Sequence, residues 1–531
     1  MNNVLLSLMV VQSINFRVIF TYILLLVCCT TDGQDAYWVF FNDKCTNKFN
    51  PHEYFTEKAI QRRLKHNLPL YDHRDLPVCK NYVAQVSDLV DSVGYTTRWL
   101  NGVVVFCSAE KIEYIKHLDI VKITQPMNVY QSALAQYDPE IEESFTEELL
   151  RKQVERMGVT FFKKEGLTGK GIIIAVFDAG FPTVNTNKAF EHIRRREGIL
   201  ATYDFVKRKE NVFAFNAHGT NVLSCIGGKK EGKRIGMATG ADFLLARTEN
   251  AHREPFSEEQ NWLKAVEWAD KNGADIINSS LAYTYSRYFS WEMDGQVSLV
   301  ARAANIAASK GILVVSAAGN DGDKSWKYIG TPGDADSALT VGGIDPNTDY
   351  HIDFSSYGPT QDKRMKPNVT AFGEVAVQGK TGLTISQGTS FSSPLVAGFA
   401  ACILENDTTL HAMELYREIE KSGHLYPYFD YAHGFGIPQA GYFLDSTNVS
   451  MKPTFEFEKG KIMLSVKISQ DSSIFDENLI FYHVENTRGY LDRYYVISAD
   501  EEYPIRLYLD EFKKGQIVRV HYKGYTESYY F

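Results

Sequence analysis

Residues 151–445 alternate short β-branched runs with helical patterns, and this alternation constrains the fold more than any other feature of the chain. Strands that alternate with helices are typical of a parallel sheet whose two faces are both covered by helices. We therefore expect an α/β domain over residues 151–445, with its ligands at the carboxyl ends of the strands. The predicted strands are Ile172–Phe177, Phe243–Ala246, Asp275–Asn278, Ile312–Ser316 and Leu339–Gly342.

The segments on either side of this region follow other patterns. Residues 35–126 combine strand and helix signals and predict a small α+β unit. Residues 127–150 are polar and acidic and predict a linker. From residue 446 the helical period disappears, and alternating apolar residues predict a small all-β C-terminal domain of sandwich type over residues 446–531. In the N-terminal unit, the predicted helices are 54–65, 78–92 and 109–117, and the predicted strands are 37–41, 102–106 and 120–123.

The N-terminal 34 residues have the pattern of an export signal. Arg17 precedes the apolar run Val18–Cys29, and a polar stretch follows. This is the arrangement of a secretory signal peptide, expected over residues 1–34, and the run is too short for a membrane span. We expect a secreted, periplasmic or cell-surface protein with no membrane span. A lipid anchor at Cys28 or Cys29 is an alternative that the sequence leaves open.

The charge and the cysteines exclude some classes of function. The net charge of -9 is spread along the chain without a long basic run, so no nucleic-acid partner is expected. Two of the seven cysteines lie in the leader, and the other five form no CxxC pair, which argues against a zinc site. A Cys45–Cys79 disulfide is compatible with an oxidising compartment, but spacing alone does not establish it.

Ser390 lies in the segment Gly388–Pro394, GTSFSSP, at a loop-to-helix junction ahead of an apolar run. A serine at the mouth of a helix gains backbone N–H donors and a favourable dipole. These suit a nucleophile whose substrate oxygen must become negative. Serine is also an ordinary helix cap, so this segment alone does not separate capping from catalysis.

Two further residues offer what such a nucleophile needs. Asp178 ends an apolar run, at the point where active sites of parallel sheets are built, although a turn or cap aspartate has the same pattern. His218 stands beside Gly219 and ahead of an apolar helix, a position that a structural histidine also takes. In acyl transfer, the aspartate could orient the histidine, the histidine could take the proton of the serine, and the serine could attack the substrate. The order aspartate, histidine, serine along the chain is one of the known solutions to this geometry.

The motifs around these residues resemble those of the subtilisin-like serine proteases, the subtilases, from Val159 to Gly436. The family's Asp-x-Gly, His-Gly-Thr-x-Val and Gly-Thr-Ser-x-x-x-Pro patterns occur at residues 178–180, 218–222 and 388–394. The resemblance implies a serine endopeptidase with Asp178, His218 and Ser390 as its catalytic residues. It also implies that Asn320 donates its side-chain amide to the oxyanion hole, although an asparagine before Asp-Gly is a common turn residue as well.

The resemblance further implies a pocket for the substrate residue before the scissile bond. Two segments, Ser280-Leu281-Ala282 and Ala317-Ala318-Gly319, are expected to line it, and extended backbone there can pair with a substrate strand. The family usually has glycine where this chain has Ala282. The added methyl group is expected to narrow the pocket or to shift a strand.

The N-terminal unit resembles the propeptide that subtilases carry, which caps the cleft and is then cut off. The layout as a whole resembles secreted subtilases of Bacteroidetes-type bacteria. We therefore expect a zymogen that is inhibited by its own propeptide, cuts itself between residues 127 and 150, and then acts on peptide or protein substrates.

The same residues leave two other functions open. One is a catalytically inactive relative that binds peptides or surfaces, and such a protein would be expected to lose at least one of the four site residues. The other is a peptide ligase. No cofactor is certain and no metal ligand is assigned. Structural calcium, which is frequent in subtilases, is compatible with the chain, but its scattered ligands cannot be identified from spacing.

Overall fold

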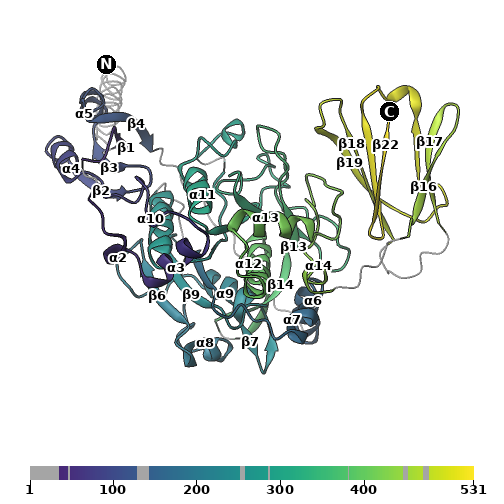
Figure 1. Ribbon diagram of the computed structural model, residues 1–531, viewed down its shortest axis with the longest axis horizontal. Coiled ribbons are helices and arrows are strands. Elements are labelled where there is room, and N and C mark those ends of the chain that lie inside the picture. The colour runs from purple at the N-terminus through teal and green to yellow at the C-terminus, as the bar shows by residue number, and fades with distance from the viewer. Residues whose placement is uncertain are drawn as a thin grey trace, which may run out of the picture. The chain divides into compact units, whose positions relative to one another are not determined.

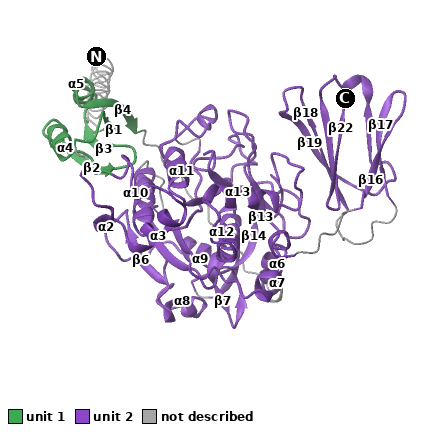
Figure 2. Cartoon of the chain, viewed as in Figure 1, with its two compact units in different colours: residues 1–47, 76–128 green, residues 48–75, 129–531 purple. Residues whose placement is uncertain are grey.

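The computed structural model describes residues 35–45, 48–127, 143–250, 257–284, 287–380, 382–445, 452–469 and 478–531. The chain divides into two compact units (Figure 2). The smaller unit contains residues 1–47 and 76–128, and the larger unit contains residues 48–75 and 129–531. The expected signal peptide with Cys28 and Cys29, and residues 128–142 of the expected linker, lie outside the described residues.

The larger unit is built around a seven-stranded sheet in the order β13-β12-β11-β10-β5-β9-β6. Figure 1 labels its strands β13, β9 and β6. Every neighbouring pair in it is parallel, which confirms the expected α/β fold. All five predicted strands are present, and β6 and β13, which the sequence did not predict, form the two edges. The strands are β5 Ile173–Asp178, β6 Ile199–Asp204, β9 Asp242–Arg247, β10 Ile276–Ser279, β11 Leu313–Ala317, β12 Ala338–Ile344 and β13 Val369–Phe372.

Helices pack on both faces of this sheet. Val176 of β5 belongs to the core that includes residues of α9 and α12. The next residue, Phe177, packs its ring against Trp262 of α10, with the ring centroids 5.7 Å apart. Since successive side chains of a strand point to opposite faces, α12 and α10 cover different faces. The main helices are α9 His218–Gly227, α10 Ser257–Lys271, α11 Leu299–Ser309, α12 Thr389–Asn406 and α13 Ala412–Lys421.

Shorter elements complete the larger unit. Two of them, α2 and α3, come from residues 48–75, which precede the expected linker in the sequence but pack with the larger unit (Figure 2). The shorter elements are α2 Pro51–Tyr54, α3 Glu57–Lys65, α6 Glu143–Glu155, α7 Val159–Lys164, α8 Glu191–Arg195, α14 Gly441–Leu444, β7 Lys229–Lys230, β8 Lys233–Arg234, β14 Glu374–Gln378 and β15 Leu383–Gln387.

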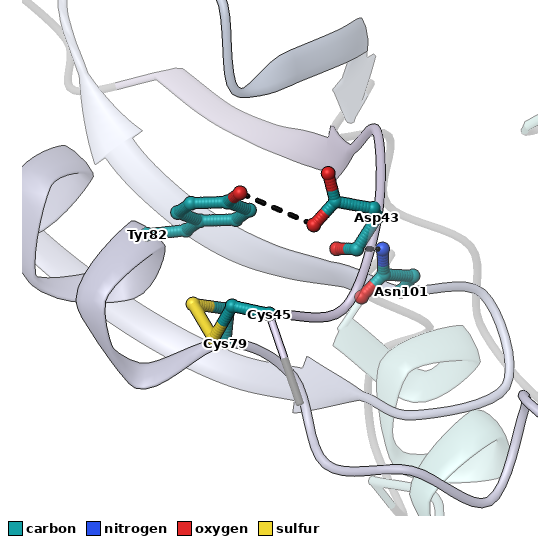
Figure 3. Close-up of a disulfide and its surroundings, with 5 residues drawn as sticks. All are labelled: Asp43, Cys45, Cys79, Tyr82 and Asn101. Carbon is teal, nitrogen blue, oxygen red and sulfur yellow. Dashed lines mark hydrogen bonds between the residues drawn. A yellow bond between two sulfur atoms is a disulfide. The ribbon is translucent and has the colours of Figure 1, made fainter. Parts of the chain in front are cut away.

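The described residues of the smaller unit form an antiparallel sheet in the order β2-β3-β1-β4 and the helices α4 and α5. The helix predicted over residues 78–92 is shorter than expected, because its last residue pairs with β3 as the start of β2. Cys45 and Cys79 form a disulfide in this unit, beside the Tyr82 hydroxyl that donates to the Asp43 carboxylate at 3.1 Å (Figure 3). The elements are β1 Asp35–Phe41, β2 Ser92–Thr97, β3 Gly102–Cys107, β4 Val121–Met127, α4 Lys80–Ser87 and α5 Ala109–Ile115.

The C-terminal region consists of two antiparallel sheets, as the sequence predicted. One sheet has the order β16-β17-β20 and the other β19-β18-β21-β22. Val466 of the first sheet and Ile480 and Val518 of the second belong to one buried cluster, so the two sheets share a core. The strands are β16 Phe455–Lys459, β17 Met463–Ile468, β18 Leu479–Glu485, β19 Leu491–Ser498, β20 Ile505–Tyr508, β21 Ile517–Tyr522 and β22 Tyr525–Tyr530.

Candidate active site

The carboxyl ends of three neighbouring strands bring predicted site segments together. In the register of the sheet, Phe177 of β5 lies beside Ser279 of β10, and Ser279 lies beside Ser316 of β11. Asp178, Ser280 and Ala317 follow these residues directly and therefore lie together at the carboxyl ends of the strands. Parallel sheets bind their ligands at these ends.

His218 and Asp178 form a part-buried hydrogen-bonded pair at the carboxyl ends of these strands. Nδ1 of His218 lies 2.9 Å from each carboxylate oxygen of Asp178, and one of these oxygens also accepts from the Ala179 amide at 2.7 Å. His218 is the first residue of α9, and Gly219 allows that helix to approach β5 closely. A Cβ atom at residue 219 would lie 2.4 Å from the Gly180 carbonyl oxygen, so only glycine fits there without a shift.

The Asp178 carboxylate controls the protonation of His218. Asp178 is fully buried, and the His218 side chain is 25% exposed. Burial disfavours the imidazolium form, but the negative charge and the hydrogen bond of Asp178 outweigh this effect. The pKa of His218 is therefore raised above its ordinary value of 6.5. The pair holds Nδ1 as the hydrogen-bonded nitrogen and leaves Nε2 as the nitrogen that can exchange a proton with another group.

Ser390 is the second residue of α12 and is held against the end of β10 by two hydrogen bonds. The Ser390 hydroxyl donates to the Ser280 carbonyl at 3.1 Å, and the Ser280 hydroxyl donates to the Ser390 carbonyl at 2.8 Å. Gly388, just before the helix, has φ of 138°, a conformation that favours glycine. The ring centroids of Phe391 and His218 lie 5.3 Å apart, so the serine segment and the histidine are neighbours.

Asn320 is held beside the start of α12 by Thr389. The Asn320 Oδ1 atom accepts from the Thr389 amide at 2.9 Å and from the Thr389 hydroxyl at 3.0 Å. These bonds use the acceptor end of the amide. The Asn320 residue is exposed, and its Nδ2 atom lies 3.3 Å from the position that a Cβ atom would take at Gly388, next to the helix N-terminus that carries Ser390.

The two predicted pocket segments lie next to each other. Ala282 and Gly319 follow the adjacent strands β10 and β11, and a Cβ atom at Gly319 would lie 3.3 Å from the Ala282 methyl group. A Cβ atom at Gly330 would lie 3.1 Å from the same methyl. The methyl group thus packs between two glycines, which leave it room. The neighbouring Leu281, Ala317 and Ala318 are buried.

The structure adds residues that the motifs alone did not single out. Thr389 orients Asn320, and the Asn278 side-chain amide donates to the Ser280 hydroxyl at 2.9 Å. Thr389 was visible only as part of the Gly-Thr-Ser pattern. Asn278 lies in the apolar run of a strand, where sequence gives no sign of a polar partner.

No group of three or more His, Cys, Asp or Glu side chains within the described ranges is placed to hold a metal ion. Calcium therefore remains an expectation from the resemblance alone. None of the helices in the described part of the chain is long and apolar enough to cross a membrane.

Two family models match this chain. The model of the "Subtilase family" matches residues 169–436, and the model of the "Peptidase S8 propeptide domain, Bacteroidota" matches residues 36–141. The chain is similar to serine protease AprX of Bacillus subtilis (strain 168), at 29% identity over 60% of this chain and 73% of that protein. It is also similar to subtilisin DY of Bacillus licheniformis, at 28% identity over 47% of this chain and 83% of that protein. Among solved structures, the MycP3 protease from the type VII (ESX-3) secretion system aligns with a TM-score of 0.46 at 20% identity, over 60% of this chain and 92% of that chain.

Proposed function

Because the chain belongs to the subtilase family, and is thus a serine endopeptidase with a propeptide domain, we propose that Ser390, His218 and Asp178 are its catalytic residues. The observation that carries this assignment is the hydrogen-bonded His218–Asp178 pair, with Nδ1 2.9 Å from both carboxylate oxygens. It stands at the carboxyl edge of the sheet, beside the helix that begins with the serine segment.

The serine attacks the carbonyl carbon of the scissile peptide bond. In the resting enzyme its hydroxyl donates to the Ser280 carbonyl, and we expect it to turn to His218 Nε2 when substrate binds, since catalytic hydrogen bonds often tighten only in the complex. His218 takes the proton and passes it to the leaving amine. Asp178 fixes the imidazole through Nδ1 and stabilises its cation, and water then hydrolyses the acyl-enzyme by the same route.

The oxyanion of the tetrahedral intermediate is assigned to Asn320 Nδ2 and to the backbone N–H of Ser390. Thr389 holds Asn320 by its acceptor end, so the donor end stays available. A neutral amide stabilises negative charge without competing for the proton of His218. The N-terminus of α12 adds a partial positive charge at the same place.

Substrates are proposed to be peptides or proteins bound as an extended strand along residues 280–282 and 317–319. The backbone of these two segments supplies hydrogen bonds to any sequence, whereas the side chains shape the pocket. Ala282, packed between Gly319 and Gly330, is the residue that limits the size of the side chain before the scissile bond.

The enzyme is proposed to be exported as an inhibited zymogen that cuts itself between residues 127 and 150. The propeptide match over residues 36–141 ends within that range. The Cys45–Cys79 disulfide supports export, because disulfides persist in oxidising compartments.

The test compares the wild type with Ser390→Ala and with the matched control Ser392→Ala. Ser392 is a buried serine of the same helix whose hydroxyl donates to the Phe372 carbonyl. We expect Ser390→Ala to lose about 10⁴-fold or more in kcat on a peptide substrate and to keep its N-terminal region, as read by intact mass. Ser392→Ala should keep its kcat on the peptide substrate and should still remove its own N-terminal region. Turnover by Ser390→Ala within tenfold of the control would contradict the assignment.

A further inference from the structure

Residues 48–75 belong to the propeptide match but pack with the larger unit. The Thr56 amide donates to the Lys271 carbonyl at 3.0 Å, at the end of α10. Helix α3 approaches Gly273 so closely that a Cβ atom there would lie 2.8 Å from the Ala59 amide nitrogen. The Ala59 and Ile60 side chains are buried. The segment is therefore docked on the larger unit through its own backbone, while its apolar side chains Phe55, Ala59 and Ile60 pack with one another.

Charged groups at the centre of this contact are fully buried. Arg63 donates to both carboxylate oxygens of Asp270, at 2.9 and 2.7 Å, and Arg62 donates to the same carboxylate. The side chains of Arg62, Arg63 and Asp270 are each about 2% exposed. Guanidinium groups suit such a place because they match a carboxylate in a fork and are weakly hydrated.

Asp270 alone does not balance two guanidinium charges, and the negative charge of Asp275 and two backbone carbonyl groups add to it at Arg62. Arg62 also donates to the carbonyl of Ala274, just after α10, and to that of Lys310, just after α11, at 3.2 Å. Carbonyl groups at helix C-termini carry partial negative charge and favour cations. A second buried pair adds to the contact, in which Lys310 Nζ lies 2.8 Å from both oxygens of Asp75.

This contact lies at the amino ends of the strands, whereas the candidate active site lies at their carboxyl ends. Asp270 and Ala274 precede β10, and Lys310 precedes β11, whereas Ser280 and Ala317 mark the other ends of the same strands. A strand of four residues such as β10 spans roughly 13 Å. The site that holds residues 48–75 is therefore separate from the cleft.

We propose that the face formed by Asp270, Ala274 and Lys310 is a binding site for the enzyme's own propeptide. The propeptide binds there through Arg62, Arg63 and Asp75, and we call this contact the anchor. The anchor retains the cut propeptide on the enzyme without any contribution from the cleft. The inference rests on the proposed self-cleavage of the zymogen. It adds that the cut propeptide is held at a second place, away from the cleft, and that its release requires the loss of this contact.

The Cys45–Cys79 disulfide closes the loop of chain that contains residues 48–75. The two cysteines flank residues 48–75 in the sequence, and both belong to the smaller unit. Closing this loop reduces the conformations of the free segment, so less entropy is lost when it docks. The disulfide thus prepares the propeptide for its binding site.

The test uses the full chain with Ser390→Ala and a recognition site for a sequence-specific protease placed between residues 128 and 142. The added protease cuts every variant equally, so the result does not depend on the chain's own catalysis. The dissociation constant of the cut propeptide is then measured for Asp270→Asn and for the control Asp242→Asn, whose carboxylate pairs with Arg196 away from the anchor.

Loss of one partner of a buried charge pair should weaken binding about 30-fold or more. We therefore expect at least that rise for Asp270→Asn and no change for Asp242→Asn. Arg63→Gln, which leaves the sequence of the catalytic part intact, should act like Asp270→Asn even if the latter folds poorly. Dissociation constants of both variants within threefold of the control would overturn the anchor. Reducing the disulfide should also weaken binding, and an unchanged constant after reduction would overturn the role given to it.

Discussion

Replacing Asp178 with asparagine removes the charge that sets the protonation of His218. In the wild type the carboxylate raises the pKa of His218 above 6.5 against the effect of burial. The base is neutral, and active, only above that pKa, so activity should fall as the pH drops through a value above 6.5. In Asp178→Asn only burial remains, and it lowers the pKa.

The direction of the change follows from the geometry. Both carboxylate oxygens lie 2.9 Å from Nδ1, and an opposite charge at such range favours the imidazolium form. The acid limb of the pH profile should therefore move to lower pH when that charge is removed. Since the asparagine amide can donate to Nδ1 and select the wrong tautomer, kcat should also fall by about 10⁴-fold.

The assay is kcat/KM on a peptide substrate between pH 4 and 9, because this parameter reports the base of the free enzyme. The chain offers a matched control in Asp430→Asn. Asp430 is buried and holds Nδ1 of His433 at 3.1 and 3.0 Å, away from the site. We expect Asp430→Asn to leave the acid limb in place. An acid limb that stays at the same pH or moves to higher pH in Asp178→Asn would refute the role given to the His218–Asp178 pair.

Three further variants test other parts of the site. Asn320→Ala should lower kcat by about 10² to 10³-fold with little change in melting temperature, and full activity would move the oxyanion role to other donors. Ala282→Gly should raise kcat/KM for a peptide with a bulky residue before the scissile bond relative to one with alanine there, by about tenfold or more, and an unchanged ratio would separate Ala282 from the pocket. Gly219→Ala places a Cβ atom 2.4 Å from the Gly180 carbonyl oxygen, so it should lower both the melting temperature and kcat, the latter by about 10²-fold, and normal values of both would show that α9 can shift freely.

Local sequence pattern predicted the central sheet well. The runs that became β5, β9, β10, β11 and β12 are buried on both faces, so their centres are largely apolar. Edge strand β6 is only partly buried and lacks such a run. β2 was missed because its residues Ser92–Thr97 are mostly half-exposed or exposed, and their strand state depends on pairing with β3.

The site and the anchor differ in how much of them a sequence can show. Ser390, His218 and Asp178 each lie in a short motif, and the three motifs together singled them out, although each alone had a structural explanation as well. The contact of Thr389 with Asn320 joins residues 69 apart, and that of Arg62 with Asp270 joins residues 208 apart. From sequence, residues 54–65 showed only a basic helix, because its partner carboxylate lies in another element. Such pairings depend on the fold and not on local pattern.

Labelling by a fluorophosphonate probe tests whether Ser390 is an activated nucleophile. The probe reacts with a serine hydroxyl only where a neighbouring base removes its proton and donors stabilise the charge that develops. We expect the processed wild type to be labelled on Ser390 and Ser390→Ala to remain unlabelled. Equal labelling of the two proteins would contradict this role of Ser390.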